Sequence, residues 1–439
     1  MNKYPNQVKE KLTSLIHEMS KTKTLYVANP DKDFTRKRKL DFETLLKMLV
    51  SMGGQSIYKE LLETFDYDLD VCTSSAFVQQ RQKILPCAFE DLMHNFTDSF
   101  IGNKSYRGYR LLAADGSDLN IAPNPKHKET YFSSKTNSKS YALMHLNAIY
   151  DLCNRLYVDA IIQTRRKINE GRALVDMVNR SPIKDKTIIV ADRNYESYNV
   201  FANIERKGWN YVIRVKDLSS TGILSGLPLP VDAEFDFSFD ITLSKRNTME
   251  IRSNPLFKHL SSSANFDFFD ESNLYYPISF RVVRLLLDNN TYETIITNLD
   301  SSDFSPDTLK EIYHLRWGIE TSFRLLKYSI GLSNFHAKKP EFICQEIFAR
   351  IIMYNFVEII TSHVVISHSD SRKHDYMVNF TVAVWICRRF LRALGNEPPL
   401  HVEALICKNI LPIRPLRLGQ SNVRKTRNKS AVSFVYRVA

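Results

Sequence analysis

The sequence predicts an α/β protein in which helices cover a mixed sheet, with an N-terminal helical region and a β-rich insertion. Three observations lead to this prediction. Residues 1–100 have the periodicity of helices, residues 109–215 alternate between strand-like and helix-like segments, and residues 217–300 are serine-rich and alternate like strands. Strands that alternate with helices are typical of a sheet with helices on its faces. The predicted regions are a helical domain at 1–105, a sheet-bearing domain at 106–216 and 301–365, a β-rich insertion at 217–300, and a C-terminal helical region with a basic tail at 366–439.

Glycine and proline residues separate the helices expected in the N-terminal region. The breaks fall at Gly53-Gly54 and Pro86. The third helix carries Arg81 and Lys83, whose side chains can contact bases or phosphates. The alternative is that both residues belong to an ordinary exposed helix face. The expected helices lie near 41–52, 55–65, 74–84 and 88–100.

Apolar runs and helical spacing then define the sheet-bearing region. Three strands come first, and a helix, a strand, a second helix and a last strand follow. This order predicts a mixed sheet with helices on its faces. The insertion adds strand-like alternation, most clearly at 235–243 and 278–287. The expected strands before the insertion are 109–114, 141–150, 156–162, 187–191 and 210–215, and the expected helices are 171–179 and 197–207.

Two carboxylates follow apolar runs of the predicted sheet. Asp115 follows residues 111–114 and precedes Gly116, and Asp192 follows residues 188–191. We expect both side chains at the C-terminal ends of strands, where the chain turns. The alternative is that each is a turn or helix-cap residue, which is a common role for Asp after a buried strand.

Four polar residues then share one face of the helix predicted after the insertion. They are Tyr313, Arg316, Glu320 and Lys327. At 100° per residue, their side chains fall within an arc of roughly 60°. Arg316 and Glu320 can also be an ordinary helix ion pair, worth a few tenths of a kcal/mol. A carboxylate between two cations beside an apolar face favours a functional site.

Three carboxylates at one point would repel one another unless cations lay among them. Carboxylate oxygens are hard ligands that suit Mg²⁺ or Mn²⁺, whereas thiolates or paired histidines would have indicated zinc. Two such ions can activate an attacking hydroxyl and stabilise the leaving oxygen in a phosphodiester displacement. We therefore expect a two-ion site formed by Asp115, Asp192 and Glu320.

The chain carries a formal net charge of +12 over 439 residues, which favours a polyanionic partner, with nucleic acid as the first candidate. Basic residues crowd 32–39 and the C-terminal tail, where they include Arg424, Lys425 and Arg427. Two separated basic clusters suit phosphate contacts along a duplex. The alternative for each cluster is a solvated arm.

Six cysteines are scattered without C-x-x-C pairs, which argues against structural zinc and against a disulfide framework. They are expected to be reduced and mostly buried. The N-terminus shows no apolar signal segment, so we expect a cytoplasmic protein. The longest apolar stretch, 348–366, contains Arg350 and Glu358, and is expected to be a core helix and not a membrane span.

Three motifs carry a resemblance to a known family. They are Asp115-Gly116-Ser117, Asp192-Arg193-Asn194-Tyr195, and the spacing Y-x2-R-x3-E-x6-K between positions 313 and 327. In these motifs the chain resembles the DDE transposases of bacterial insertion sequences, specifically the insertion sequence four family. The resemblance spans about residues 40–365. One departure is Asn194, where the family commonly has Gly; Asn tolerates a left-handed turn, so the same turn is expected.

The resemblance implies an RNase H-like catalytic fold, with the three carboxylates as metal ligands and the insertion between the second Asp and the Glu. It also implies binding of terminal inverted repeats and target DNA, self-association in the complex that pairs two DNA ends, and association with the bacterial nucleoid when bound to DNA. Trp317, beside Arg316, is expected to be a packing residue. The residues expected to contact DNA through the family motifs are Tyr313, Arg316, Lys327 and Arg193.

The leading hypothesis is therefore a transposase that cuts DNA at element ends and joins them to a target by metal-assisted phosphoryl transfer. A first alternative is a DNA-binding derivative without catalysis, which the intact set of three acids disfavours. A second alternative is a nuclease that hydrolyses DNA without strand transfer. Its active site would contain the same residues, so the sequence leaves it open.

Overall fold

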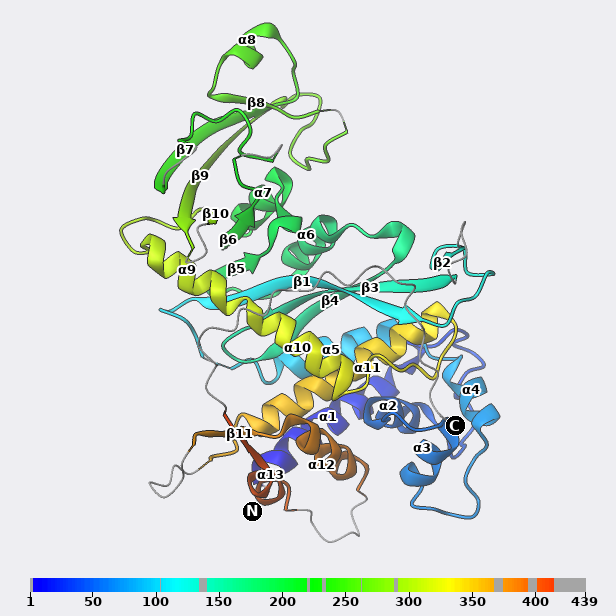
Figure 1. The fold of residues 1–439 in the computed structure, drawn as a ribbon. Coiled ribbons are helices and arrows are strands. Elements are labelled where there is room, and N and C mark those ends of the chain that lie inside the picture. The colour runs from blue at the N-terminus through cyan, green and yellow to red at the C-terminus, as the bar shows by residue number, and fades with distance from the viewer. Residues whose placement is uncertain are drawn as a thin grey trace.

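The computed structural model describes residues 3–102, 104–133, 140–218, 222–230, 234–261, 263–287, 291–366, 374–393 and 401–413. Figure 1 shows a large sheet with helices on both faces, β7 and β9 extending away at one end, and most of the helices gathered at the other. The fold is thus mixed α/β, as predicted.

Within the described residues the main sheet has ten strands in the order β2-β3-β1-β5-β6-β10-β9-β7-β8, with β4 also paired to β3. β1 is antiparallel to β3 and parallel to β5, and β5 is parallel to β6. The sheet is therefore mixed. Its strands are β1 (Arg110–Ile121), β2 (Tyr131–Phe132), β3 (Tyr141–Asp151), β4 (Leu156–Thr164), β5 (Thr187–Ala191), β6 (Asn210–Val215), β7 (Phe235–Ser244), β8 (Phe257–His259), β9 (Tyr275–Leu286) and β10 (Tyr292–Thr297).

The β-patterned segment 217–300 continues this same sheet. β10 pairs with β6 in antiparallel register, β9 pairs with β10, and β7 pairs with β9. The segment thus adds its strands to the edge that β6 would otherwise leave unpaired. One hydrogen-bonded sheet therefore runs from β1 through β5, β6 and β10 to β9 and β7.

Helices cover the two faces of the sheet unequally. On one face α6 and α7 pack through a core that includes Leu112, Ala114 and Ile189. On the other face α9 packs over β5 and β6, while α10 and α11 pack over β1 and β4. These helices are α6 (Glu170–Arg180), α7 (Tyr198–Arg206), α9 (Pro306–Leu315), α10 (Trp317–Tyr328) and α11 (Pro340–Thr361).

The N-terminal and C-terminal helices gather around α11. That helix contacts α1, α2, α5, α12 and α13, and it is buried along almost its whole length. The expected core helix at 348–366 is therefore confirmed for 348–361, where α11 ends, and no helix among the described residues is long and apolar enough to cross a membrane. The surrounding helices are α1 (Lys3–Lys21), α2 (Phe42–Ser51), α3 (Ile57–Thr64), α4 (Ser74–Arg81), α5 (Cys87–Asp98), α12 (Phe380–Arg392) and α13 (Val402–Lys408).

Three expectations about local structure need correction. The sequence reading missed α1, a 19-residue helix whose apolar positions Val8, Leu12 and Ile16 recur at a helical spacing. The helix expected at 74–84 ends at Arg81. The six cysteines are free, but Cys387 alone is buried; Cys87 is exposed, and the other four are partly exposed. Two further short elements are the helix α8 (Met249–Ser253) and the pair β11 (Tyr376–Val378) and β12 (Ile410–Pro412).

Candidate active site

Asp115 lies within β1 and not at its end, which corrects the expectation of a strand-end turn. The parallel ladder with β5 stops at Ala114, but the antiparallel ladder with β3 continues to Ile121. A strand ends only when both neighbours release it, and β3 does not. Asp115 therefore sits where the parallel partner ends, on the sheet face that carries α10.

The carboxyl group of Asp115 is mostly buried, and burial raises its pKa to about 7. The nearby Asp192 and Glu320 carboxylates add to this rise, while the N–H of Gly116 and the Arg316 guanidinium oppose it. The Gly116 N–H donates to Oδ1 of Asp115 at 2.8 Å. The site thus disfavours a third negative charge unless a further cation is present.

Asp192 directly follows β5, as the sequence predicted. Its Oδ1 accepts a hydrogen bond from the N–H of Asn194 at 2.9 Å, so it also caps the short 3-10 turn Arg193–Tyr195. Asp192 is therefore both a carboxylate at the end of a strand and a cap residue, as the two interpretations of the sequence proposed. Asn194 lies in that turn, and the described residues with positive φ do not include it, so the expected left-handed turn is absent.

The four polar residues predicted to share one helix face, Tyr313, Arg316, Glu320 and Lys327, do not lie on one straight helix. α9 ends at Leu315 and α10 begins at Trp317, and the N–H of Arg316 donates to the carbonyl of Tyr313 at 3.1 Å in a tight turn. The break turns Trp317 outward, where it is 50% exposed. The expected packing role of Trp317 is thus not observed.

Arg316 joins two of the carboxylates. Its Nη2 lies 2.8 Å from Oε1 of Glu320, and its Nη1 lies 4.0 Å from Oδ2 of Asp115. Burial alone would lower the pKa of the guanidinium, but Tyr313, Glu320 and Asp115 together raise it. The side chain is buried, and in the part of the chain that the structure describes, its Nε has no hydrogen-bond partner. Arg316 is therefore the cation that now balances the acidic site.

The first and last of these four residues, Tyr313 and Lys327, form contacts within the protein. Tyr313 lies on α9, is only 5% exposed, and belongs to the core cluster that includes Val212 of β6. Burial raises its pKa. Lys327 donates from Nζ to the carbonyl of Asp118 at 3.0 Å, and burial lowers its pKa. Tyr313 thus offers DNA little surface, whereas Lys327 lies along the continuation of β1.

The chemical type of the three acidic side chains suits a hard divalent cation. Asp115, Asp192 and Glu320 offer carboxylate oxygens, and burial, with the nearby Asp192 and Glu320 carboxylates, raises the pKa of Asp115. As the side chains lie, however, no group of three or more His, Cys, Asp or Glu residues among the described residues is arranged to hold a metal ion. Arg316 lies between two of the acids, so metal binding would require the side chains to rearrange.

The remaining sequence-predicted DNA contacts fall in very different places. Arg193 is exposed in the turn after Asp192. Arg81 is 2% exposed and forms an ion pair with Glu346 at 2.9 Å, so it is a core residue and presents no surface to DNA. Its position at the end of α4 turns it toward α11, which spacing within α4 could not indicate. The predicted contacts of the tail, at Arg424, Lys425 and Arg427, lie outside the described residues.

Lys83 lines a basic hollow of about 370 Å³. Its Nζ donates a hydrogen bond to Oε1 of Gln80 at 3.0 Å and lies 5.6 Å from the ring centre of Phe34. The loop of basic residues noted in the sequence supplies the rest of the lining. The structure therefore brings together the basic cluster near 32–39 and the end of α4. The cationic residues of this basic hollow are Lys32, Arg36, Arg38 and Lys83.

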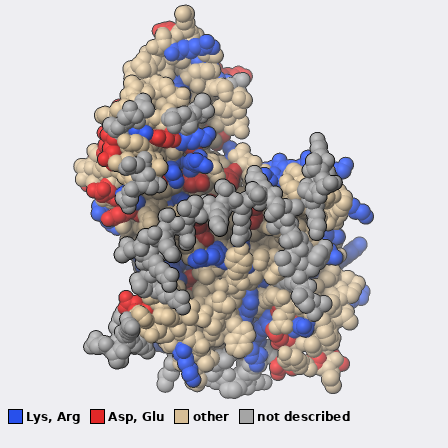
Figure 2. All heavy atoms as spheres, viewed as in Figure 1, with Lys and Arg blue, Asp and Glu red and all other residues tan. Residues whose placement is uncertain are grey.

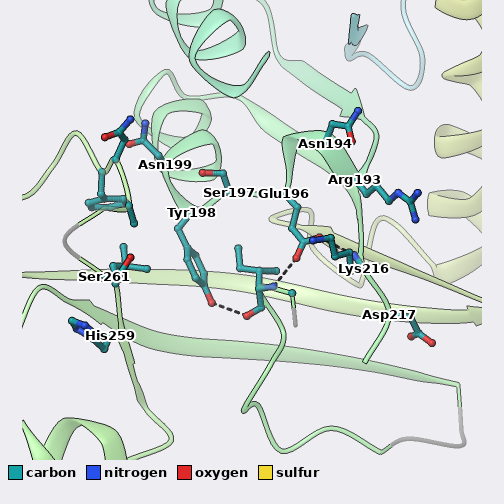
Figure 3. Close-up of a pocket in the computed structure, with 16 residues that line it drawn as sticks. Arg193, Asn194, Glu196, Ser197, Tyr198, Asn199, Lys216, Asp217, His259 and Ser261 are labelled. Carbon is teal, nitrogen blue, oxygen red and sulfur yellow. Dashed lines mark hydrogen bonds between the residues drawn. The ribbon is translucent and has the colours of Figure 1, made fainter. Parts of the chain in front are cut away.

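A larger hollow of about 1210 Å³ opens beside the turn that follows Asp192 (Figure 3). Its wall includes Arg193, and Glu196 ties the wall together by accepting from the N–H groups of Lys216 at 2.8 Å and Ile223 at 2.5 Å. Glu196 thus links the turn after β5 to the start of the insertion. The sequence reading missed this residue, because its partners lie 20 and 27 positions away.

Charged side chains of both signs lie on the face of the molecule that Figure 2 shows. Figure 2 shows Lys and Arg spread over one face and interspersed with Asp and Glu, without a single dominant basic patch. Among the described residues, the basic hollow lined by Lys83 is therefore a defined place where an anion would be held.

A family model described as "Transposase DDE domain" matches residues 106–356, which is more than half of the chain. Among solved structures, the chain is similar to a piggyBac transposase in a synaptic complex with hairpin DNA, at 13% identity and a TM-score of 0.45, over 95% of this chain and 87% of that one. No curated protein sequence matches.

Proposed function

The chain belongs to the transposase DDE domain family, whose members are in general DNA-cleaving enzymes, and on that premise we propose that it cleaves DNA at the ends of an insertion sequence and joins them to target DNA. The observation that carries this proposal is the approach of the Asp192 and Glu320 carboxylates to Asp115, with the buried Arg316 at 2.8 Å from Glu320 and 4.0 Å from Asp115. The first two acids come from neighbouring parallel strands, and the third comes from a helix packed over them.

Asp115, Asp192 and Glu320 are the residues that would hold Mg²⁺ or Mn²⁺, and we propose two ions. Bound there, the ions would supply Lewis-acid stabilisation of the attacking and leaving oxygens at a phosphodiester. The protein supplies the rest of the chemistry. The parallel ladder of β1 and β5 ends at Ala114 and Ala191, directly before the two aspartates, and the burial of Asp115 reduces screening of its carboxylate by bulk water.

Arg316 has a defined place in this proposal. While it pairs with Glu320 and approaches Asp115, it neutralises the acids. Release from Glu320 would free a guanidinium to contact a neighbouring DNA phosphate with charge-assisted hydrogen bonds. Lys327, on the same helix, would contact a phosphate further along the strand, and Arg193 would contact DNA at the mouth of the large hollow.

The finer classification is also a proposal. The spacing Y-x2-R-x3-E-x6-K supports a place in the insertion sequence four family. An RNase H-like fold for residues 106–216 and 301–365 is supported by three antiparallel strands followed by two parallel strands, each of the latter preceded by a helix. Residues 1–105 and the C-terminal tail are proposed to bind DNA.

Transposition joins two element ends to a target, so the proposed partners are terminal inverted repeats, target DNA and a second copy of the chain. The net charge of +12 supports a polyanionic partner. The exposed Arg193 and the basic hollow at Lys83 are the places where the described residues favour such contacts.

The proposal is tested with purified protein and the DNA that flanks its gene. We expect divalent-metal-dependent cuts at the element ends and joined products when a target plasmid is added, with no cutting of scrambled ends. Cuts without joined products would identify a nuclease. End binding without cuts in either Mg²⁺ or Mn²⁺ would identify a DNA-binding derivative and contradict the proposal.

Lys83→Ala is expected to weaken binding to end DNA without lowering the melting temperature. The side chain lines the basic hollow and does not form a buried ion pair, so its loss removes about one phosphate contact. The slope of log affinity against log salt should therefore fall by roughly one. Lys11→Ala, an exposed lysine of α1, is the charge-matched control. An equal loss in both variants would show that only net charge matters.

A further inference from the structure

His145 lies directly behind the strand segment that carries Asp115. It is a residue of β3, 5% exposed, and its partner across the β1 ladder is Asp118. Its Nδ1 is 2.8 Å from Oδ1 of Asp118, and its Nε2 is 3.0 Å from Oε1 of Glu170. The ring is therefore enclosed by a carboxylate on each side.

The His145 ring and Glu170 leave room for nothing larger than glycine at position 116. A Cβ at that position would lie 2.4 Å from Nε2 of His145 and 2.7 Å from Oε1 of Glu170, both closer than real contacts allow. Gly116 is also the residue whose N–H donates to Oδ1 of Asp115. The ring thus packs against the residue that orients the Asp115 carboxylate.

The three residues come from three elements. Asp118 belongs to β1, His145 to β3, and Glu170 is the first residue of α6. Successive residues of a strand point to opposite faces, so Gly116 and Asp118 face α6 while Asp115 faces α10. The cluster therefore ties β1, β3 and α6 together on the face opposite the acids.

The charge state of the ring supports a strong tie. Burial would lower the pKa of His145, but the hydrogen bond to Asp118 and the negative charges of Asp118 and Glu170 raise it to about 9. The positive charges of Arg165 and Lys327 also stabilise the carboxylate form of Asp118 and lower its pKa, after the larger effect of the hydrogen bond with His145. An imidazolium with a carboxylate at each nitrogen forms charge-assisted contacts, which are stronger than neutral ones.

We propose that His145, held between Asp118 and Glu170, is a positioning residue that fixes the backbone at Gly116 and thereby sets the direction of the Asp115 carboxylate toward the metal ions. This inference rests on the proposed function. Preorganised ligands bind a metal with less reorganisation, and loss of a residue that orients them commonly costs 10-fold to 100-fold in affinity.

The test compares His145→Asn with His94→Asn in the full-length protein. His94 is a matched control, because it also ties a helix to the sheet through an aspartate, Asp159, at 2.9 Å, and its pKa is also raised, with burial opposing and Asp159 raising it. His94 lies on α5, and the side chains that pack against Gly116 are those of His145 and Glu170. Three quantities are measured: melting temperature, Mn²⁺ affinity by electron paramagnetic resonance, and affinity for end DNA in EDTA.

We expect His145→Asn to weaken Mn²⁺ binding by roughly tenfold, to leave DNA affinity in EDTA within about twofold, and to regain cleavage in part at higher Mg²⁺. His94→Asn should lower the melting temperature and leave Mn²⁺ affinity unchanged. A lower melting temperature with normal Mn²⁺ affinity in His145→Asn would show a merely structural role and overturn the inference.

Glu170→Gln provides a second variant if His145→Asn does not fold, because it keeps an acceptor for the ring and removes one charge. A normal Mn²⁺ affinity in that variant would likewise overturn the inference. The same measurements on wild-type protein distinguish failure of the proposed function from failure of the proposed role of His145. If it neither binds Mn²⁺ nor cleaves DNA, the proposed function fails; if it does both and the variants match it, only the role of His145 fails.

Discussion

Asp115→Asn is expected to abolish DNA cleavage in Mg²⁺ while the protein continues to bind element ends. The substitution keeps the shape of the side chain and removes the charge that a divalent cation requires. Asp192→Asn and Glu320→Gln should have the same effect, since the three acids are proposed to act together. A gel assay with labelled end DNA, run in Mg²⁺ for cleavage and in EDTA for binding, measures both quantities.

Asp240→Asn serves as the control for these variants. Asp240 is an exposed residue of β7 in the same sheet and lies on the insertion. Its substitution should change neither cleavage nor binding. Wild-type cleavage in any one of the three active-site variants would remove that residue from the proposed metal ligands.

The same substitution at Asp115 has a predicted effect on stability. The pKa of this carboxyl is about 7 in the folded protein and near the ordinary aspartate value of 3.8 when unfolded. The folded state therefore holds a proton that the unfolded state releases, and stability falls as pH rises from about 4 to 7. In metal-free buffer above pH 7, Asp115→Asn should thus melt at a higher temperature than wild type, with no difference below pH 4.

Glu346→Ala is expected to destabilise the protein by about 3 to 5 kcal/mol, the typical cost of leaving one member of a buried ion pair alone. Glu346 is 1% exposed on α11. It pairs with Arg81 at 2.9 Å, and it also accepts from the N–H groups of His336 and Ala337, each at 2.9 Å. Its removal would leave the buried guanidinium of Arg81 and two N–H groups without this acceptor.

Urea unfolding measures this effect, and Glu341→Ala, an exposed residue on the same helix, is the control. Burial would raise the pKa of Glu346, but Arg81 and His336 hold it well below its ordinary value. The stabilisation is therefore complete above the unfolded pKa of about 4.5 and is lost as pH falls below it. A loss under 1 kcal/mol at pH 7 would show that the pair contributes little to the fold.

Arg81 and Lys83 illustrate why sequence spacing could not assign their roles. Both are basic residues near the end of the third predicted helix, and both were candidates for DNA contact. One is buried against α11 and bonded to residues more than 260 positions away, and the other lines an open basic hollow. The partners that decide between the two roles are remote in sequence.

The sequence by itself determined the central strands and the candidate acids. β5 and β6 have the predicted bounds, because a central strand buried on both faces reads as a continuous apolar run. Asp192 follows such a run, so its place after the strand was also predictable. The spacing of Arg316 and Glu320 likewise placed them within reach of each other, and they form an ion pair.

Only the tertiary structure decided how these parts meet. β1 extends past Asp115 because β3 continues to pair with it, and β10 joins β6 so that the insertion lengthens the same sheet. The approach of Arg316 to Asp115 and the clamp of His145 behind Gly116 also appear only in three dimensions. The physical reason is that periodicity and apolar runs report local burial, whereas ladders, ion pairs and close packing depend on partners tens to hundreds of residues away.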